Sequence, residues 1–505
     1  MKRGILNALS GVGSQILIII FGLMVPQLIM SRFGTDMYGL TNTIIQVFNY
    51  FALLEAGVGA ATLQALYKPI AQDDKPAISG IMSATQNYYR RTGIVYLLAV
   101  IAFAVIYPLL LSGSGIPFGT VFALVMMQGL VGVANYFFQG KFRCFLEAEG
   151  KSYVTANLLA VVTILTNVFK VVFLNLGFDI VAVQSTYLIF NLLQMLILGI
   201  YMRRHYNWIN LKAKPDFGAI SKKNSAMVHQ VASLVFNSTD LLILNAFCGL
   251  AISGVYSTYM LVFSMVTTIL RTISTSVSFA LGQALQTSKK AHDAMHDCFE
   301  VYYSVLAFTA VCVVYIFIPH FIKLYTVNIT DVNFASTQFQ YLPLLFMIMS
   351  LLDNSRPPYV NLITYAGHFK ETQVHAIIES VINLSVSLVC VNFWGIYGVL
   401  IGTIAALVYR TNQMMIYANK KIKGTSPATS YRRWGVNIGL FIVVVFVSSN
   451  FTLNIQNYWD IILWALLYLV IIGSIFFLVD SLANRAAFRF LKQSFKPVLK
   501  KLLNR

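Results

Sequence analysis

Long apolar stretches separated by short polar segments form the main pattern of the sequence. Fourteen stretches can be counted, and most reach the roughly 20 residues that an α-helix needs to cross the hydrocarbon core of a bilayer. The pattern therefore predicts an all-α integral membrane protein with fourteen transmembrane helices and no attached soluble domain. The stretches are roughly residues 8–31, 40–66, 93–112, 118–140, 152–175, 180–202, 226–247, 253–285, 299–318, 339–366, 373–394, 395–418, 434–453 and 460–480.

The composition supports this prediction. Of the 505 residues, 58% are hydrophobic and only 11% are charged, which excludes a water-soluble protein. We expect the first stretch to remain in the mature protein, because it is longer than the apolar core of a signal peptide, contains Pro26 and lacks a small-x-small cleavage site before Arg32. The five cysteines are odd in number and scattered, so neither a disulfide framework nor a metal knuckle is indicated.

The distribution of positive charge predicts the orientation of the chain. Thirty of the 36 lysines and arginines fall in the loops and the tail on the side of the amino terminus, and four lie inside the spans. Only Arg32 and Lys323 lie on the opposite side. Because positively charged loops stay on the cytoplasmic side and the number of spans is even, we expect both termini to be cytoplasmic.

The same distribution explains the net charge of +18, which in a soluble protein would suggest nucleic-acid binding. Here the excess of positive charge is explained by the orientation of the chain in the membrane, so no nucleic-acid partner is expected. In residues 481–505, basic residues recur at helical spacing beside a stripe of Phe488, Leu491, Phe495 and Leu499. This spacing predicts an amphipathic helix on the anionic inner leaflet, with a frayed basic tail as the alternative.

Motifs for catalysis or cofactor binding are incomplete. Residues 145–152, FLEAEGKS, end like a phosphate-binding loop, but Phe145 replaces the first glycine and no strand precedes it. His292 and His296 are one helical turn apart, a spacing that can hold a metal, but a solvated cytoplasmic loop is the simpler interpretation. No Ser-His-Asp arrangement or carboxylate pair converges within one segment, so we expect neither an enzyme nor a cofactor.

Charged residues inside the apolar stretches are the most informative feature. Each one costs at least about 2.5 kcal/mol to insert, so by default it faces a partner or a water-filled path. For any single residue, an ion pair between helices or a side chain that reaches the interface is an equally good explanation. Eight together predict a polar interior. They are Glu55, Lys170, Asp240, Arg271, Asp353, Arg356, Glu379 and Arg410, and Pro357 and Pro358 are expected to break the helix after Arg356.

The sequence also repeats itself at a distance of about 216 residues. Gly34 and Gly249, Gly150 and Gly367, Asn167 and Asn383, and Gly177 and Gly395 are separated by 215, 217, 216 and 218 residues. The repeat predicts two parallel six-helix lobes related by an axis along the membrane normal. The expected parts are an N-lobe (1–205), a basic linker (206–225), a C-lobe (226–418), two extra helices (434–480) and the basic tail (481–505).

The repeat places an acid opposite a base. Glu55 corresponds to Arg271, so the two are expected at equivalent depths on either side of a cavity between the lobes. Asp240 and Lys170 have no charged counterparts. The cavity is therefore expected to be asymmetric in charge, which suits a ligand with two different ends.

Several longer motifs are informative together. They are SRFGTDMYG (31–39), LLEAGVGAATL (53–63), AEGKSYVTANLLAVVTILTNVF (148–169), STDLLIL (238–244), GHFKETQVHAIIESVINLSVSL (367–388) and GIYGVLIGT (395–403). With these motifs the chain resembles, over essentially its whole length, the Wzx-like oligosaccharide flippases of the MOP superfamily, which are related to the MATE drug transporters and the lipid II flippases. Lipid II flippases carry several arginines in their first two spans, whereas this chain has Gln15, Gln27 and Glu55 there, which disfavours lipid II as cargo.

The resemblance implies a multi-pass protein of the bacterial plasma membrane that moves a polyprenyl-pyrophosphate-linked oligosaccharide to the outer leaflet. Its partners would be this substrate, the inner-leaflet lipids and the machinery that polymerises and exports the polysaccharide. A pyrophosphate needs cationic partners on a hydrated path. We expect Arg271 to be the main one. The other expected cavity residues are Glu55, Asp240, Lys170, Arg356, Asp353 and Gln15, with Glu55 and Asp240 as candidates for ion coupling.

Two other protein classes remain as alternatives. An ion-coupled multidrug exporter would share the fold but have twelve spans and a more aromatic pocket. A membrane glycan polymerase or transferase would carry a large outer loop, and here the longest expected outer loop, about residues 319–338, is short. The energy source, whether protons, sodium or the substrate gradient, stays open.

Overall fold

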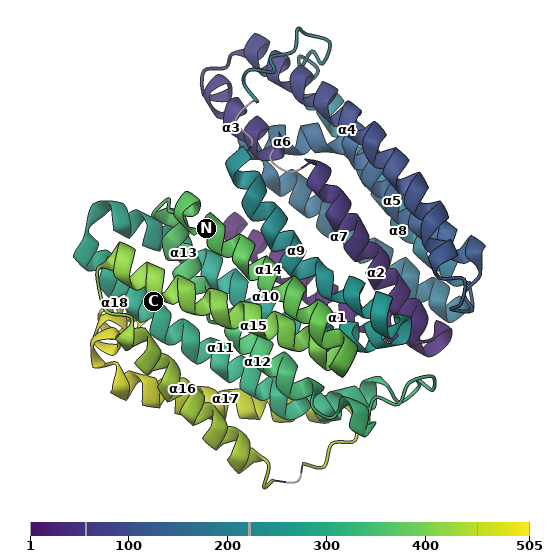
Figure 1. Cartoon of the computed structure of the whole chain (residues 1–505). Coiled ribbons are helices and arrows are strands. Elements are labelled where there is room, and N and C mark those ends of the chain that lie inside the picture. The colour runs from purple at the N-terminus through teal and green to yellow at the C-terminus, as the bar shows by residue number, and fades with distance from the viewer. Residues whose placement is uncertain (1, 56–57, 221–223, 452, 504–505) are drawn as a thin grey trace. The chain divides into compact units, whose positions relative to one another are not determined.

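The computed structural model describes residues 2–55, 58–220, 224–451 and 453–503. These residues form helices and connecting turns, without a strand (Figure 1). The elements are α1 (Lys2–Phe33), α2 (Thr35–Phe51), η1 (Ala52–Glu55), α3 (Val58–Ala71), α4 (Lys75–Leu110), α5 (Phe118–Ala134), η2 (Asn135–Gln139), α6 (Gly140–Ala148), α7 (Ser152–Leu176), α8 (Ile180–His205), α9 (Asn224–Cys248), α10 (Leu250–Thr287), α11 (Lys289–Tyr325), η3 (Thr337–Phe339), α12 (Leu342–Asn354), α13 (Pro357–Tyr365), α14 (Phe369–Trp394), α15 (Ile396–Tyr417), η4 (Ala418–Lys423), α16 (Ala428–Ser448), α17 (Tyr458–Ala483) and α18 (Arg485–Leu503).

Eleven helices in the described part of the chain are long and apolar enough to cross a membrane, and Leu17–Phe33 is a shorter apolar helix. Together they confirm an all-helical, multi-pass membrane protein. Two of the fourteen expected stretches, 40–66 and 339–366, are each divided into shorter helices. The first is interrupted by η1, and the second is interrupted before Pro357, as the two prolines predict.

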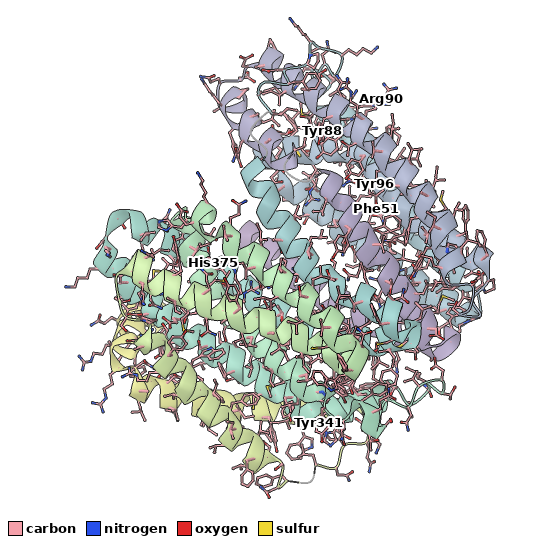
Figure 2. All side chains as sticks on the ribbon, in the orientation of Figure 1. Phe51, Tyr88, Arg90, Tyr96, Tyr341 and His375 are labelled. Atoms are coloured by element: carbon pink, nitrogen blue, oxygen red, sulfur yellow. The ribbon has the colours of Figure 1, made fainter. Side chains whose placement is uncertain are left out.

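The chain divides into two compact units, residues 1–254 and 255–505, with the division near the start of α10. In the first unit, α2 packs against α9, and α5 packs against α4 and α8. Aromatic rings fill part of this packing, since Phe51 and Tyr96 have centroids 5.8 Å apart (Figure 2). The expected lobe boundary at 206–225 rests on the repeat and stays a prediction.

In the second unit, α14 and α15 run side by side (Figure 1). Gly398 and Gly402 make this close approach possible, because a Cβ atom at Gly402 would lie 2.1 Å from Ser387 Oγ and one at Gly398 would lie 2.2 Å from the Cys390 carbonyl oxygen. The long helix α11 packs against α12, α16, α17 and α18. The two helices beyond the repeat are therefore held by α11.

Positive-φ glycines reproduce the repeat. Gly34 (φ 88°) and Gly249 (φ 85°) end the first helix of each copy, and Gly150 (φ 75°) and Gly367 (φ 78°) occupy equivalent turns. Gly177 (φ 93°) and Gly395 (φ 53°) form a third pair. These backbone angles are open to glycine at little cost, so matched turns explain why the same residue recurs at the same distance.

Candidate functional site

A polar face on α10 is the first part of the candidate site. Thr268, Arg271, Thr272, Thr275 and Ser276 are all exposed and lie within one sector of the helix, because residues three and four apart share a face. An arginine and four hydroxyls exposed at membrane depth are costly unless water reaches them. This sector of α10 is therefore suited to line a hydrated path, whereas the neighbouring exposed sector carries Ile269 and Ile273.

The hydroxyl groups on this face are held by their own helix. Thr268 Oγ1 donates to the Ser264 carbonyl at 2.8 Å, and Thr272 Oγ1 donates to the Thr268 carbonyl at 2.9 Å. Ser276 Oγ donates to the Thr272 carbonyl at 2.8 Å. Since each hydroxyl hydrogen is used within the helix, the oxygen lone pairs remain able to accept hydrogen bonds from a ligand.

A ladder of ion pairs extends from this face, and we call its five residues the ion-pair ladder. Arg271 Nη2 on α10 lies 3.0 Å from Asp353 Oδ2 on α12, and Asp353 Oδ1 lies 3.4 Å from Arg356 Nη1. The same Arg356 nitrogen lies 3.1 Å from Glu379 Oε1 on α14. Glu379 Oε2 lies 3.4 Å from Arg410 Nε on α15. With three arginines and two carboxylates, the ladder carries one net positive charge.

Burial changes steeply along the ladder. The Arg271 side chain is 60% exposed, while those of Arg356, Glu379 and Arg410 are 15%, 7% and 4% exposed. Arg410 also donates to Gln413 Oε1 at 2.6 Å. The inner pairs are therefore fixed in a low-dielectric environment, and the outer arginine is the one that a ligand can reach.

Polar side chains fix the helices that carry the ladder. Asn354 at the end of α12 donates to Thr267 Oγ1 on α10 at 3.0 Å. Asn361 on α13 donates to Ser274 Oγ at 2.9 Å, so Ser274 is a packing contact. The break between α12 and α13 places Arg356 at the N-cap of α13, where its side chain contacts both carboxylates of the ladder.

The sequence prediction named three members of the ladder as site residues and noted Glu379 and Arg410 as buried charges. The structure brings all five together in the second unit. Of the polar face, the sequence prediction named Arg271 as a site residue and missed Thr268 and Thr272. Their spacing of four residues around Arg271 is a signal that could have identified them.

The remaining predicted site residues belong to the first unit. The side chains of Glu55 and Gln15 lie outside the described residues. Asp240 on α9 is buried. Lys170 on α7 lies 5.8 Å from the ring centroid of Tyr187, a cation–π contact. The placement of these residues in a shared cavity stays a prediction.

A second buried polar network was missed by sequence reasoning. Asp297 on α11 lies 2.7 Å from Lys423 and 3.1 Å from Arg433 on α16. Arg433 also lies 2.7 Å from Glu300, which accepts a hydrogen bond from Tyr359 at 2.9 Å. Sequence analysis assigned Lys423 and Arg433 to basic loops, because a charge count along the chain does not show which charges are paired inside the protein.

The interpretation of His292 and His296 as residues of a solvated loop is wrong. Both are buried in α11, and His296 Nε2 lies 3.1 Å from the Pro358 carbonyl oxygen. Ligand atoms of His296, Asp297 and Glu300 lie within 4.8 Å of one another, a spacing that could hold a metal. Lys423 and Arg433 together already neutralise both carboxylates, so the group is electrostatically unsuited to a cation.

The network continues into α17 through Asp480. Asp480 is fully buried, and its Oδ1 accepts from Asn437 Nδ2 at 3.3 Å and from Asn484 Nδ2 at 3.4 Å. Asp480 Oδ2 has no hydrogen-bond partner. Asn484 also accepts from Arg433 at 3.2 Å, so the same network holds α11, α16 and α17 together.

An apolar groove of about 550 Å³ lies beside the ladder, between α11, α12, α15 and α16. Leu352, next to Asp353, and Trp434 line it. Trp434 Nε1 donates to Ser355 Oγ at 2.9 Å, immediately before Arg356. The groove therefore brings an apolar wall within a few residues of the charged ladder.

Comparison with known proteins identifies the fold. No protein-family model matches the sequence, and no curated protein sequence matches it. A MATE-family multidrug resistance transporter of the MOP superfamily, in its inward-facing conformation, matches with a TM-score of 0.60 at 14% identity, over 80% of this chain and 98% of its own. The lipid II flippase MurJ, in an inward closed conformation, matches with a TM-score of 0.63 at 14% identity, over 95% and 99%.

The chain shares its fold with these two solved structures. At this sequence identity the likeness shows the fold alone. The two proteins are a transporter and a flippase, and both belong by name or superfamily to the group that the sequence motifs resemble. The resemblance inferred from the sequence is therefore confirmed at the level of the fold, and the oligosaccharide-flippase subtype stays a proposal.

Proposed function

We propose that the protein is a flippase that moves a polyprenyl-pyrophosphate-linked oligosaccharide from the cytoplasmic to the outer leaflet of a bacterial plasma membrane, for cell-surface polysaccharide synthesis. In this proposal the chain crosses the membrane fourteen times, with both termini in the cytoplasm. The divided helices α2–α3 and α12–α13 each provide one crossing. Two six-helix lobes would alternate access to a central polar cavity.

The observation that carries the proposal is the exposed Arg271 at the outer end of a ladder with net positive charge. Asp353, 3.0 Å from Arg271, compensates the charge of the guanidinium. A pyrophosphate would replace Asp353 as the partner of the guanidinium, whose planar fork can donate two hydrogen bonds to phosphate oxygens. Arg356 lies between two carboxylates and is less exposed than Arg271. It would add positive potential near the phosphates without contacting them directly.

The surroundings of Arg271 suit the other parts of this substrate. Hydroxyl oxygens of Thr268, Thr272 and Thr275 on the same face can accept hydrogen bonds from sugar hydroxyls. The apolar groove beside Asp353 has the chemistry that a polyprenyl tail requires. A headgroup on α10 and a tail in the groove would let the sugar cross while the tail stays in hydrocarbon.

The extent of the structural similarity is consistent with a flippase. The MurJ fold covers 95% of the chain, whereas the MATE transporter covers 80%. A transporter with twelve helices would leave the last two of fourteen helices in this chain unmatched. The lower coverage by the MATE transporter agrees with this expectation.

The proposal is tested in a deletion strain of the source organism. Membrane lipids are extracted and analysed by mass spectrometry for polyprenyl-pyrophosphate-linked sugars. We expect one such species to accumulate and to return to the native level when the gene is restored. Unchanged lipid-linked sugars, with surface polysaccharide intact, would contradict the proposal.

A multidrug exporter is the second candidate, because a MATE transporter shares the fold. It predicts a different outcome in the same strain. Susceptibility to cationic amphipathic drugs would rise, and the lipid-linked sugars would not change. The net positive charge of the ladder argues against cationic cargo, because the exposed Arg271 would repel it.

A further inference from the structure

A second cavity lies entirely within the first unit. It has a volume of about 690 Å³ and lies between the segment formed by η2 and α6 and the carboxyl-terminal half of α8. Its wall includes the cations Lys141 and Arg203, and none of the described residues that line it is acidic. The cavity is therefore an electropositive site that the transport proposal does not use.

Lys141 is the most unusual residue of this cavity. It is only 7% exposed, and its Nζ donates to the Phe137 carbonyl oxygen at 3.0 Å. Among the described residues no carboxylate forms an ion pair with it, although an ammonium group has three donors to satisfy. Burying a cation without a counter-charge is expensive, so an anion from outside the protein is the natural partner.

Local backbone structure explains why Lys141 points into the cavity. The π-helix Asn135–Gln139 inserts a wider turn between α5 and α6, and Lys141 is the second residue after it. Such π-turns occur often at functional sites. The Lys141 ammonium also lies 5.0 Å from the ring centroid of Phe142, which stabilises the charge without neutralising it.

The second cation and the nearby acid complete the electrostatic picture. Arg203 lies in the last turn of α8, at the end that the charge distribution predicts to face the side of the basic loops. Tyr206 also lines the cavity, but its hydroxyl donates to Glu149, which in turn lies 3.0 Å from Lys151. Glu149 is thus already paired and does not offset the charge of Lys141 and Arg203.

The rest of the wall is apolar and open to the surroundings of the helix bundle. Leu192, Leu196 and Ile200 on α8 line the cavity and are exposed. Exposed aliphatic side chains on a membrane-spanning helix face acyl chains. An entering ligand would therefore contact hydrocarbon on one side and two cations on the other.

We propose that this cavity binds an anionic phospholipid of the leaflet that faces the basic loops, with its phosphodiester between Lys141 and Arg203. Basic pockets between transmembrane helices on this side are suited to such headgroups. The acyl chains would lie along Leu192, Leu196 and Ile200. A sugar-bearing lipid is disfavoured here, because among the residues of the wall only Tyr206 and Asn207 offer uncharged polar groups.

The test uses the purified full-length protein in a nonionic detergent and measures lipid binding by native mass spectrometry. Phosphatidylglycerol and phosphatidylcholine with identical acyl chains are the probes. We expect phosphatidylglycerol to bind the native protein about tenfold more tightly, and Arg203→Gln to remove most of this preference. Arg204→Gln, an exposed neighbour that does not line the cavity, is the matched control and should bind as the native protein does.

Lys141→Met separates lipid binding from folding. The substitution removes a buried charge, so the variant should have a melting temperature in lipid-free detergent at least equal to that of the native protein. Phosphatidylglycerol should no longer raise the melting temperature of the variant. Lipid selectivity retained by both Lys141→Met and Arg203→Gln would overturn the proposal. Preferential binding of polyprenyl phosphate over phosphatidylglycerol, or displacement of the lipid by inorganic phosphate, would also overturn it. Transport assays on Arg271 variants do not depend on this outcome.

Discussion

Substitution of Arg271 should separate transport from folding, because the ion-pair ladder runs from an exposed end to a buried end. Arg271→Ala removes the exposed arginine and leaves Asp353 paired with Arg356 at 3.4 Å. Glu379→Gln removes the shared partner of two buried arginines. The two substitutions are expected to affect different properties of the same protein.

The effect of Arg271→Ala on stability should be small. The Arg271 side chain is 60% exposed, and solvent-exposed ion pairs contribute about 0–1 kcal/mol after screening and side-chain entropy are counted. We therefore expect the free energy of unfolding to change by less than about 1 kcal/mol. Membrane abundance of the variant should then match that of the native protein.

The effect of Glu379→Gln on stability should be large. Its carboxylate is 7% exposed and lies 3.1 Å from Arg356 and 3.4 Å from Arg410. Breaking a buried pair leaves an uncompensated charge and costs about 3–5 kcal/mol. We expect a reduced melting temperature in detergent and reduced abundance in the membrane.

Export per folded protein should fall more in Arg271→Ala than in Glu379→Gln, the reverse of their effects on stability. A charge-assisted hydrogen bond to phosphate contributes about 1.5–3 kcal/mol, so loss of the guanidinium should reduce export more than tenfold. Arg271→Lys should retain a fraction, because the charge persists without the bidentate geometry. The assay is the amount of lipid-linked sugar that accumulates per folded protein, with the exposed Arg432→Ala as the matched control.

Two results would refute this reasoning. Full export by Arg271→Ala at normal abundance would mean that the arginine does not contact the cargo. Restoration of export by the exchange of charges, Arg271→Asp with Asp353→Arg, would mean that the pair only holds α10 and α12 together.

Three further predictions concern topology, the polar face and the carboxyl-terminal helices. A reporter fused after Arg505 should be cytoplasmic, while a cysteine at the exposed Asn328 should react with an impermeant thiol reagent added outside intact cells. Thr275→Cys should be labelled by a small hydrophilic thiol reagent, whereas Ile273→Cys on the neighbouring sector should not; inert cysteines at both positions would contradict a hydrated path. Asp480→Leu should lower the free energy of unfolding by about 1–3 kcal/mol, because each of two buried amides loses its side-chain acceptor and keeps only a backbone carbonyl, and Asp480→Asn should cost less because a side-chain acceptor remains; equal melting temperatures would show that these hydrogen bonds add little.

Much of the backbone could be predicted from the sequence because membrane insertion imposes strong constraints. Apolar stretches must be helical where lipid offers no hydrogen bonds, so nearly every expected stretch coincides with a helix or a helix pair. The repeat was readable because glycines such as Gly34 and Gly249 occupy positions with positive φ. Such turns tolerate few other residues, so their spacing persists when side chains diverge.

Side-chain partners could not be predicted in the same way. A hydropathy pattern treats every charged residue near a helix end as a loop residue, which is why Arg433 and Lys141 were both assigned to loops. In the structure Arg433 is buried between Asp297 and Glu300, and Lys141 is buried in α6. Which charges meet depends on contacts between residues far apart in the sequence, 82 positions for Arg271 and Asp353 and 136 for Arg433 and Asp297, and that information is absent from local patterns.

The two segments that the predicted repeat aligns differ in helix continuity at the position where the sequence predicted opposite charges. In the second copy, α10 runs without a break from Leu250 to Thr287 and carries Arg271 within a polar face. In the first copy the corresponding segment is interrupted by η1 (Ala52–Glu55). A continuous helix can hold a charge at a fixed position relative to its neighbours, whereas a short 3₁₀ segment often marks a hinge. The continuous α10 is therefore the segment suited to hold Arg271 in place against Asp353 of the ion-pair ladder.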